Sequence, residues 1–107
     1  MNKPAQFLKS FLHPYQEGKV KFILSGSASD YNITYKSSED QAYQLPHAQK
    51  SWRYNFKAHE GDYVYFSAQA NEPGAEVRVK IVYNGRVFKE SKASGDFALA
   101  HTGGSLC

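Results

Sequence analysis

The sequence predicts an all-β protein, and three observations carry that prediction. Eight Tyr and seven Phe occur in 107 residues that contain one Met, and aromatic side chains favour the pleated surface of a strand. From Gly18 onward, apolar and polar residues alternate with the period of two that a half-buried strand requires. Turn residues such as those at 71–74 (NEPG) separate the alternating runs. Together these observations predict a single antiparallel sandwich or barrel, and the wet and apolar faces of most runs favour two sheets packed face to face.

The alternation predicts about seven strands within residues 18–102. The segment 37–49 has no firm period and contains Pro46, so it is predicted to be a long loop with at most a short edge strand near Tyr43. Residues 103–107 are predicted to be a flexible tail because they follow the last run and begin with Gly-Gly. The predicted core consists of Phe22, Leu24, Ile33, Trp52, Tyr54, Phe56, Val64, Phe66, Val79, Ile81 and Phe88.

Residues 1–17 are predicted to be an N-terminal segment, a short helix or an extension. Four apolar residues in it recur at the spacing of a helical stripe, and Pro14 ends any helix before it. The stripe is interpreted as a surface that docks on the domain, with contact to a membrane surface or a partner as alternatives. These residues are Phe7, Leu8, Phe11 and Leu12.

Composition argues against several classes of function. Thirteen Lys and Arg against ten Asp and Glu give a net charge of +3, which does not by itself indicate a nucleic-acid partner. Cys107 is the sole cysteine, so no intrachain disulfide or thiolate metal cluster is expected, although its thiol could join two chains. The four histidines lack zinc-site spacing, and no nucleophile elbow, phosphate loop or dinucleotide motif occurs. We therefore expect no cofactor, no metal and no enzymatic activity, and the absence of an apolar run of about 20 residues predicts no membrane span.

The stretch VKIVYNGRVFKE, residues 79–90, predicts a hairpin with Asn84-Gly85 as its turn. In a regular ladder this turn would place Lys80 opposite Lys89, and Phe88 would face the core before the strand bulges. With Arg78, these lysines are interpreted as a small anion-binding patch or as solvated charges that protect an edge strand from pairing.

A second candidate surface combines aromatic and basic side chains. Tyr63 and Tyr65 are expected to face away from the core, near Arg53 and Lys57 if their two strands pair. Such a face could stack the bases and contact the phosphates of single-stranded nucleic acid, whereas ordinary cross-strand packing is the alternative. The predicted binding surface therefore comprises Arg53, Lys57, Tyr63, Tyr65, Arg78, Lys80 and Lys89.

The order of the segments FILSGSASDYNITY, GDYVYFSAQAN, VRVKIVYNGRVFKES and SGDFALA resembles the extracytoplasmic domain of the mycobacterial membrane protein small (MmpS) family and its short bacterial relatives. The resemblance covers about residues 20–100 and rests on turns and alternation. It implies a seven-stranded immunoglobulin-like β-sandwich that serves large membrane exporters of lipids and siderophores as a non-catalytic accessory. Val79 stands where that family often has a disulfide cysteine.

These observations predict a non-catalytic module that binds a protein or acts as a transport accessory. Single-stranded nucleic acid or another polyanion is an alternative ligand, and a small molecule or glycan bound between loops is a second alternative. A homo-oligomer could form through edge strands or through the N-terminal segment. The location is cytoplasmic if Met1 is the native start, and extracytoplasmic if the resemblance extends to location and a leader has been removed.

Overall fold

The protein is built from strands in two antiparallel sheets. The computed structural model describes residues 17–37 and 41–107, so the helix predicted near the N-terminus lies outside the described residues. Within the described part, the chain forms eight strands and no helix. These are β1 (Glu17–Gly26), β2 (Tyr31–Lys36), β3 (Ala42–Ala48), β4 (Arg53–His59), β5 (Tyr63–Ala70), β6 (Ala75–Tyr83), β7 (Arg86–Gly95) and β8 (Leu99–Ser105).

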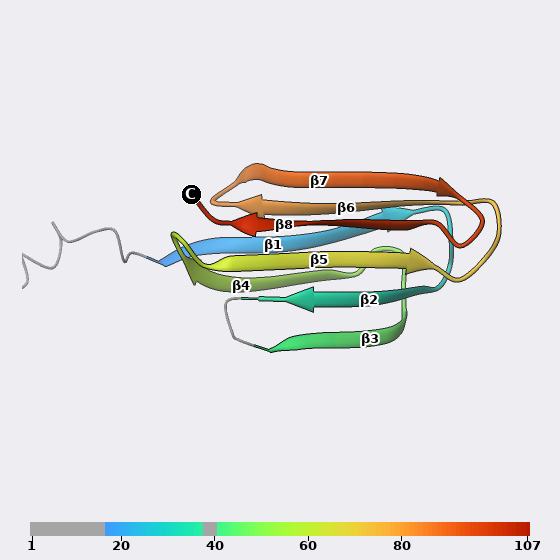
Figure 1. The fold of residues 1–107 in the computed structure, drawn as a ribbon, viewed down its shortest axis with the longest axis horizontal. Helices are drawn as coiled ribbons and strands as arrows, with labels where there is room; N and C mark the ends of the chain where they lie inside the picture. The colour runs from blue at the N-terminus through green and yellow to red at the C-terminus, as the bar shows by residue number, and fades with distance from the viewer. Residues whose placement is uncertain (1–16, 38–40) are drawn as a thin grey trace, which may run out of the picture.

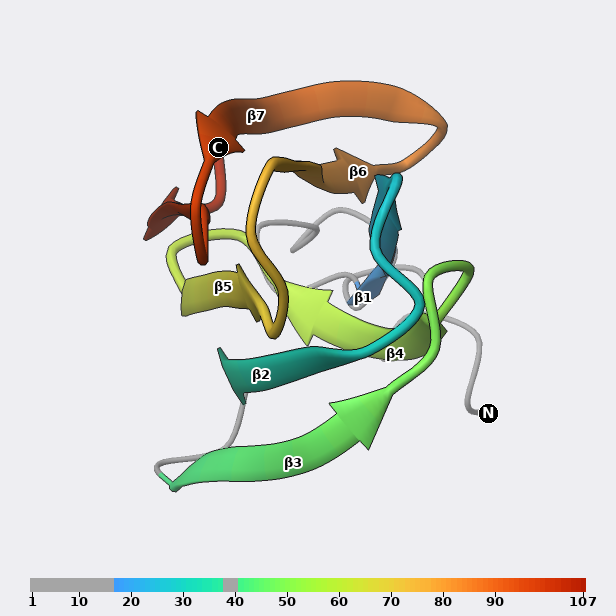
Figure 2. The same ribbon diagram turned by 90° about the vertical axis from the view of Figure 1, so that its right-hand side faces the viewer.

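Each sheet contains four strands and combines segments from both halves of the chain. Sheet A has the order β4-β1-β6-β7, and sheet B has the order β3-β2-β5-β8 (Figure 1). The connections β1–β2, β5–β6 and β7–β8 pass from one sheet to the other at the end of the molecule that Figure 2 faces. The all-β, sandwich-like architecture predicted from the alternation is confirmed.

The core lies between the two sheets and follows the period of two. On β1, Val20, Phe22 and Leu24 are buried, whereas Lys19 and Lys21 are exposed. The rings of Phe22 in sheet A and Phe66 in sheet B stack with centroids 4.9 Å apart and planes at 9°. Burial of two such rings contributes several kcal/mol in total. The stack therefore joins the sheets near the centre of the core.

Most of the predicted core residues are buried or packed against the core. Four aromatic ones, Trp52, Tyr54, Phe56 and Phe88, are partly buried. Several residues outside the predicted core are also buried, and the largest of them are Tyr31 in β2 and Leu106 after β8.

The structure changes two predicted boundaries. The edge strand expected near Tyr43 is present but longer than predicted, because β3 takes seven residues of the segment predicted as a loop and includes Pro46; an edge tolerates proline because one side of the strand needs no ladder hydrogen bond. The segment 103–107 is not a tail, because β8 extends to Ser105 and Leu106 is buried. The main-chain N–H of Leu106 donates to Asp62 O at 2.9 Å, and the N–H of Gly61 donates to Leu106 O at 2.7 Å.

The hairpin β6–β7 has the predicted turn but a different register. Val82 pairs with Val87, and Ile81 pairs with Lys89, so the strand bulges at Phe88 itself. Lys80 consequently lies opposite Glu90 rather than Lys89. The predicted opposition of two lysines is therefore wrong, because the bulge moves the rest of β7 by one residue.

Candidate functional site

The outer face of sheet A carries most of the positive charge of the described residues. Among residues 18–37 and 41–107, seven Lys and Arg side chains accompany two Glu on this face, because alternate residues of a strand point to the same side of the sheet. We call this surface the basic face. Its charged members are Lys19, Lys21, Arg53, Lys57, Arg78, Lys80, Lys92, Glu76 and Glu90.

Pairing across the strands brings like charges into neighbouring positions. Lys19 on β1 is the register partner of Lys57 on β4, and Arg78 on β6 is the partner of Lys92 on β7. Like charges directly opposite one another in a sheet disfavour folding. Glu90 offsets part of this charge, since its Oε2 atom lies 3.6 Å from Arg78 Nε, but exposed ion pairs are weak.

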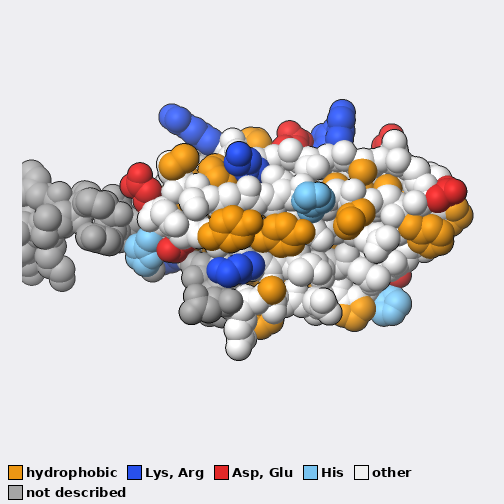
Figure 3. All heavy atoms as spheres, viewed as in Figure 1, with side chains coloured by type: hydrophobic (Ala, Val, Ile, Leu, Met, Phe, Trp, Pro, Cys, Tyr) orange, Lys and Arg blue, Asp and Glu red, His pale blue; other side chains and the backbone are white. Residues whose placement is uncertain are grey.

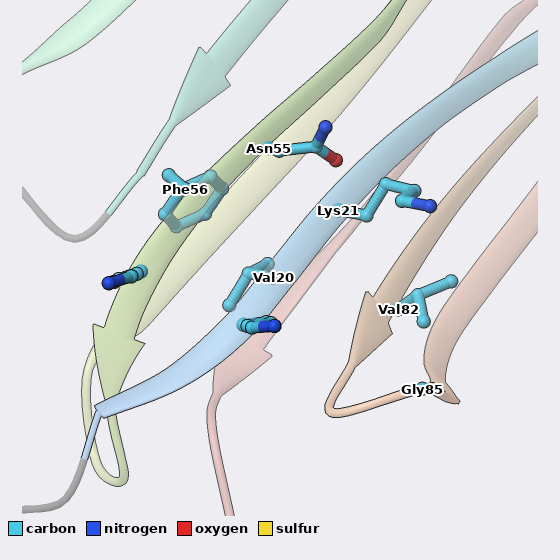
Figure 4. Close-up of a pocket in the computed structure, with 8 residues that line it drawn as sticks. Val20, Lys21, Asn55, Phe56, Val82 and Gly85 are labelled. Atoms are coloured by element: carbon cyan, nitrogen blue, oxygen red, sulfur yellow. The ribbon is translucent and has the colours of Figure 1, made fainter.

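A shallow hollow of about 510 Å³ lies at one end of the basic face. Figure 4 shows Lys21, Asn55 and Val82 around it, and these side chains arise from β1, β4 and β6. Lys19 and Lys57 also line the hollow. The ammonium groups of these lysines therefore surround an apolar area formed by the Val82 side chain and the methylene chains of the lysines.

The turn Asn84-Gly85 fixes one wall of this hollow. Both residues have positive φ, 53° and 82°, as a type I′ turn requires. The N–H of Asn84 donates to Lys19 O at 2.8 Å, and the N–H of Lys19 donates to Asn84 Oδ1 at 2.9 Å. The hairpin turn thus holds β1 in place beside the hollow.

A second groove of about 640 Å³ lies at the opposite end of the basic face, and Arg78 and Lys92 contribute its cations. Its lining also includes Glu76 and the hydroxyl groups of three serines. Ser27 Oγ accepts a hydrogen bond from the N–H of Glu76 at 2.8 Å. This groove is more polar but less positive than the first hollow, because Glu76 opposes its two cations.

The structure separates the aromatic and basic residues that the sequence grouped together. Strand β4 pairs with β1 in sheet A, whereas β5 pairs with β2 and β8 in sheet B. The assumed pairing of their strands was therefore wrong. Arg53 and Lys57 lie on the outer face of sheet A, and Tyr63 and Tyr65 lie on the outer face of sheet B.

The other predicted residues divide in a similar way. Arg78 and Lys80 belong to the basic face, where their strand is internal to the sheet. Lys89 instead follows the bulge, with its Nζ atom 5.6 Å from the Phe88 ring centroid, and the end of its side chain lies beside Gly104 of β8. Lys89 and Lys92 are on the edge strand β7, the position at which lysines protect a sheet from further pairing.

Sequence reasoning missed three cations of the basic face, Lys19, Lys21 and Lys92. The alternation around Val20 indicated that Lys19 and Lys21 share a wet face. It did not indicate that β4 and β6 lie on either side of β1. A regular ladder from the Asn84-Gly85 turn would put Lys92 on the core side, whereas the bulge at Phe88 moves it to the outer face, opposite Arg78.

Ionisable groups elsewhere form small polar contacts at the ends of the strands. Hydrogen bonds from Asn71 and then His47 lower the pKa of Asp30 below its ordinary value. His59 Nδ1 lies 3.8 Å from Asp62 Oδ2. Among residues 17–37 and 41–107, no three His, Cys, Asp or Glu side chains are placed to hold a metal ion together.

The same part of the chain contains no helix of the length and apolarity needed to cross a membrane. No protein-family model and no curated protein sequence matches this chain, so neither comparison assigns an activity to the basic face.

Proposed function

We propose that the protein is a non-catalytic binding module that holds an extended polyanion on the basic face of sheet A. The observation that carries the proposal is the distribution of charge: seven Lys and Arg against two Glu on this face, and a single Lys, Lys36, on the outer face of sheet B. A net charge of +3 for the whole chain conceals this separation.

Electrostatics favours such a ligand because cations that are held close together repel one another until an anion screens them. The strands hold the Cα atoms of Lys19 and Lys57 in register, and those of Arg78 and Lys92 likewise. A chain of phosphate, sulfate or carboxylate groups that runs diagonally along the face, from one end to the other, would contact both pairs. It would also release its counterions, which adds a favourable and salt-dependent contribution to the free energy of binding.

The basic face favours recognition of charge over recognition of bases. Among the described residues, its uncharged side chains include Ile23, Asn55 and Val82 but no Phe, Tyr or Trp, so stacking of unpaired bases has no large aromatic platform there. The tyrosines that supported single-stranded nucleic acid lie on the other sheet. The ligand of this face is therefore an anionic backbone or an acidic surface, which the protein recognises by its negative charges.

The strand pairings support the immunoglobulin-like class as the finer description of the fold. Strand β1 pairs with β4 in sheet A, and β2 pairs with β5 in sheet B. Strands B and E, and strands C and F, have this relationship in immunoglobulin-like sandwiches. The hairpin β6–β7 is an addition to that arrangement, because it lies between β5 and β8 in the sequence and returns to sheet A. Within this proposal, kinship with the MmpS family and a transport-accessory role remain hypotheses.

The direct test is the affinity for a fluorescent polyphosphate chain, measured by anisotropy at increasing KCl concentration. We expect the logarithm of the association constant to fall linearly with the logarithm of salt, with a slope that reports the number of contacts. A variant with Lys21→Glu, Arg53→Glu and Lys80→Glu should lose at least about tenfold in affinity and show a shallower slope.

The matched control places the same change of charge away from the basic face, with Lys50→Glu, Arg86→Glu and Lys89→Glu. This control should lose much less affinity than the basic-face variant. Equal losses in the two variants would show that net charge alone drives binding, and an affinity that ignores salt would contradict the proposal.

A further inference from the structure

The outer face of sheet B differs from the basic face in both charge and shape. Figure 3 views this side of the molecule and shows hydrophobic side chains in a row along its middle, with a lysine or arginine and a histidine beside them. The register places Tyr63 and Tyr65 of β5 and Leu99 of β8 on this outer face, and of these Tyr63 is 48% and Leu99 51% exposed. Exposed aromatic side chains that lie together are a feature of binding surfaces.

The two tyrosines form the centre of a flat surface that we call the tyrosine platform: Tyr63, Tyr65, His101 and Gly103. Residues two apart on a strand share a face and are separated by about 6.6 Å. The ring centroids of Tyr65 and His101 are 6.4 Å apart, and their planes make an angle of 35°. Lys36 Nζ lies 6.0 Å from the centroid of the Tyr63 ring, within the range of a cation–π contact.

Gly103 keeps this surface flat. It is the register partner of Tyr65, and a Cβ atom at Gly103 would stand 3.2 Å from Tyr65 Cδ1 and 2.6 Å from the main-chain oxygen of Val64. The position therefore has no room for a side chain. The half-exposed Tyr65 side chain therefore lies directly beside the backbone of β8.

Uncharged hydrogen-bonding groups extend from the platform along the same face. Thr34 of β2 is the register partner of the buried Ser67 of β5, and Asn32 is the partner of Gln69. Asn32 Oδ1 accepts a hydrogen bond from Asn71 Nδ2 at 3.2 Å, and Gln69 Nε2 donates to Phe97 O at 3.3 Å. These bonds orient the two exposed amide side chains, which lie farther along the same face than the rings.

We propose that the tyrosine platform binds a neutral oligosaccharide. When a sugar ring stacks on an aromatic ring, its apolar C–H face and the aromatic face are both removed from water, which favours binding. The hydroxyl groups of the sugar can form hydrogen bonds with neutral amides and hydroxyls of the protein, so no charged group has to lose its water. A nucleic acid fits this face less well, because Lys36 is its only formal cation among the described residues. This site is independent of the basic face and of its polyanion.

The test is calorimetric titration of the full chain with uncharged hexasaccharides: cellohexaose, xylohexaose, mannohexaose and maltohexaose. We expect at least one to bind with a dissociation constant of about 1 mM or lower, and the affinity to change little when the salt concentration is raised. Tyr63→Ala should weaken binding at least about threefold by removing a stacking ring, whereas Tyr63→Phe should retain most of the affinity. Tyr63 is suited to this comparison because its exposed ring can be removed without opening the core.

The Lys21→Glu, Arg53→Glu, Lys80→Glu variant separates the two sites. It should bind the oligosaccharide as the unchanged protein does, although it loses affinity for polyphosphate. Failure of all four sugars to bind would overturn the platform proposal while leaving the polyanion proposal intact. Binding that survives Tyr63→Ala unchanged, or that disappears in the basic-face variant, would also overturn it.

Discussion

Tyr31 on β2 donates its hydroxyl hydrogen to the main-chain oxygen of Glu76 on β6, at 3.1 Å, and thereby links the two sheets. The same hydroxyl oxygen accepts a hydrogen bond from the N–H of Ala28 at 3.0 Å. Both bonds lie where the chain passes from β1 in sheet A to β2 in sheet B. The tyrosine is fully buried, so water cannot replace these partners.

Replacement of Tyr31 by Phe should lower the free energy of unfolding by about 1–3 kcal/mol, because the buried N–H of Ala28 loses its acceptor. Chemical denaturation with urea would measure the change. Tyr63→Phe is a matched control that removes a hydroxyl from an exposed tyrosine, and it should leave stability nearly unchanged. Equal effects of the two substitutions would show that the bonds of Tyr31 do not stabilise the fold.

The same hydroxyl predicts a loss of stability in alkaline solution. Burial raises the pKa of the Tyr31 hydroxyl above the ordinary tyrosine value of 10.0, and this effect exceeds the opposing effect of the hydrogen bond from Ala28. The folded state therefore retains this proton at a pH where the unfolded state has released it, so stability falls as the pH rises above about 10. Melting temperatures measured from pH 8 upward would reveal the decline, and Tyr31→Phe should reduce its slope. An unchanged slope in the variant would assign the decline to other groups.

Asn84 contributes both a turn conformation and a bond to β1, and two substitutions separate these contributions. Asn84→Gly tolerates the positive φ but removes the acceptor of the Lys19 N–H, whereas Asn84→Ala loses both. We expect both to destabilise the protein, with Asn84→Ala worse by roughly 1 kcal/mol. Urea denaturation of the two variants would measure the difference. The opposite order would mean that backbone strain at this turn is unimportant.

Phe22 should be the most costly core residue to truncate. Its ring contacts Tyr35, Tyr54, Phe56 and Phe66, with centroid distances from 4.9 to 6.5 Å. Phe22→Ala should lower the free energy of unfolding by about 3–5 kcal/mol.

Trp52 provides a graded comparison for that measurement. It is only partly buried, although it packs on Tyr35 and Phe66 at 5.4 and 5.6 Å, so Trp52→Ala should cost somewhat less than Phe22→Ala. Val87→Ala, at a side chain that is 55% exposed, should have little effect. Thermal melts of the three variants would test the order, and a melting temperature unaffected by Trp52→Ala would contradict its contribution to the core.

Local sequence determined the strands, the faces and the main turn. Alternation alone placed Phe22, Val64 and Ile81 inside, and Asn84-Gly85 specified the hairpin, because side-chain direction and turn type depend on residues that are neighbours in the chain. The same alternation indicated that Lys19 and Lys21 share a wet face. It could not identify β3 clearly, because an exposed edge strand such as this one has little apolar alternation to detect.

Tertiary structure alone decided which wet faces become one surface. The basic face exists because β4, β1, β6 and β7, which are distant in sequence, lie side by side in sheet A. The separation of Tyr63 from Arg53 has the same cause, since successive strands β4 and β5 belong to different sheets. Strand order and the bulge at Phe88 depend on how buried surfaces fit across the whole domain, and a period of two contains no information about that fit.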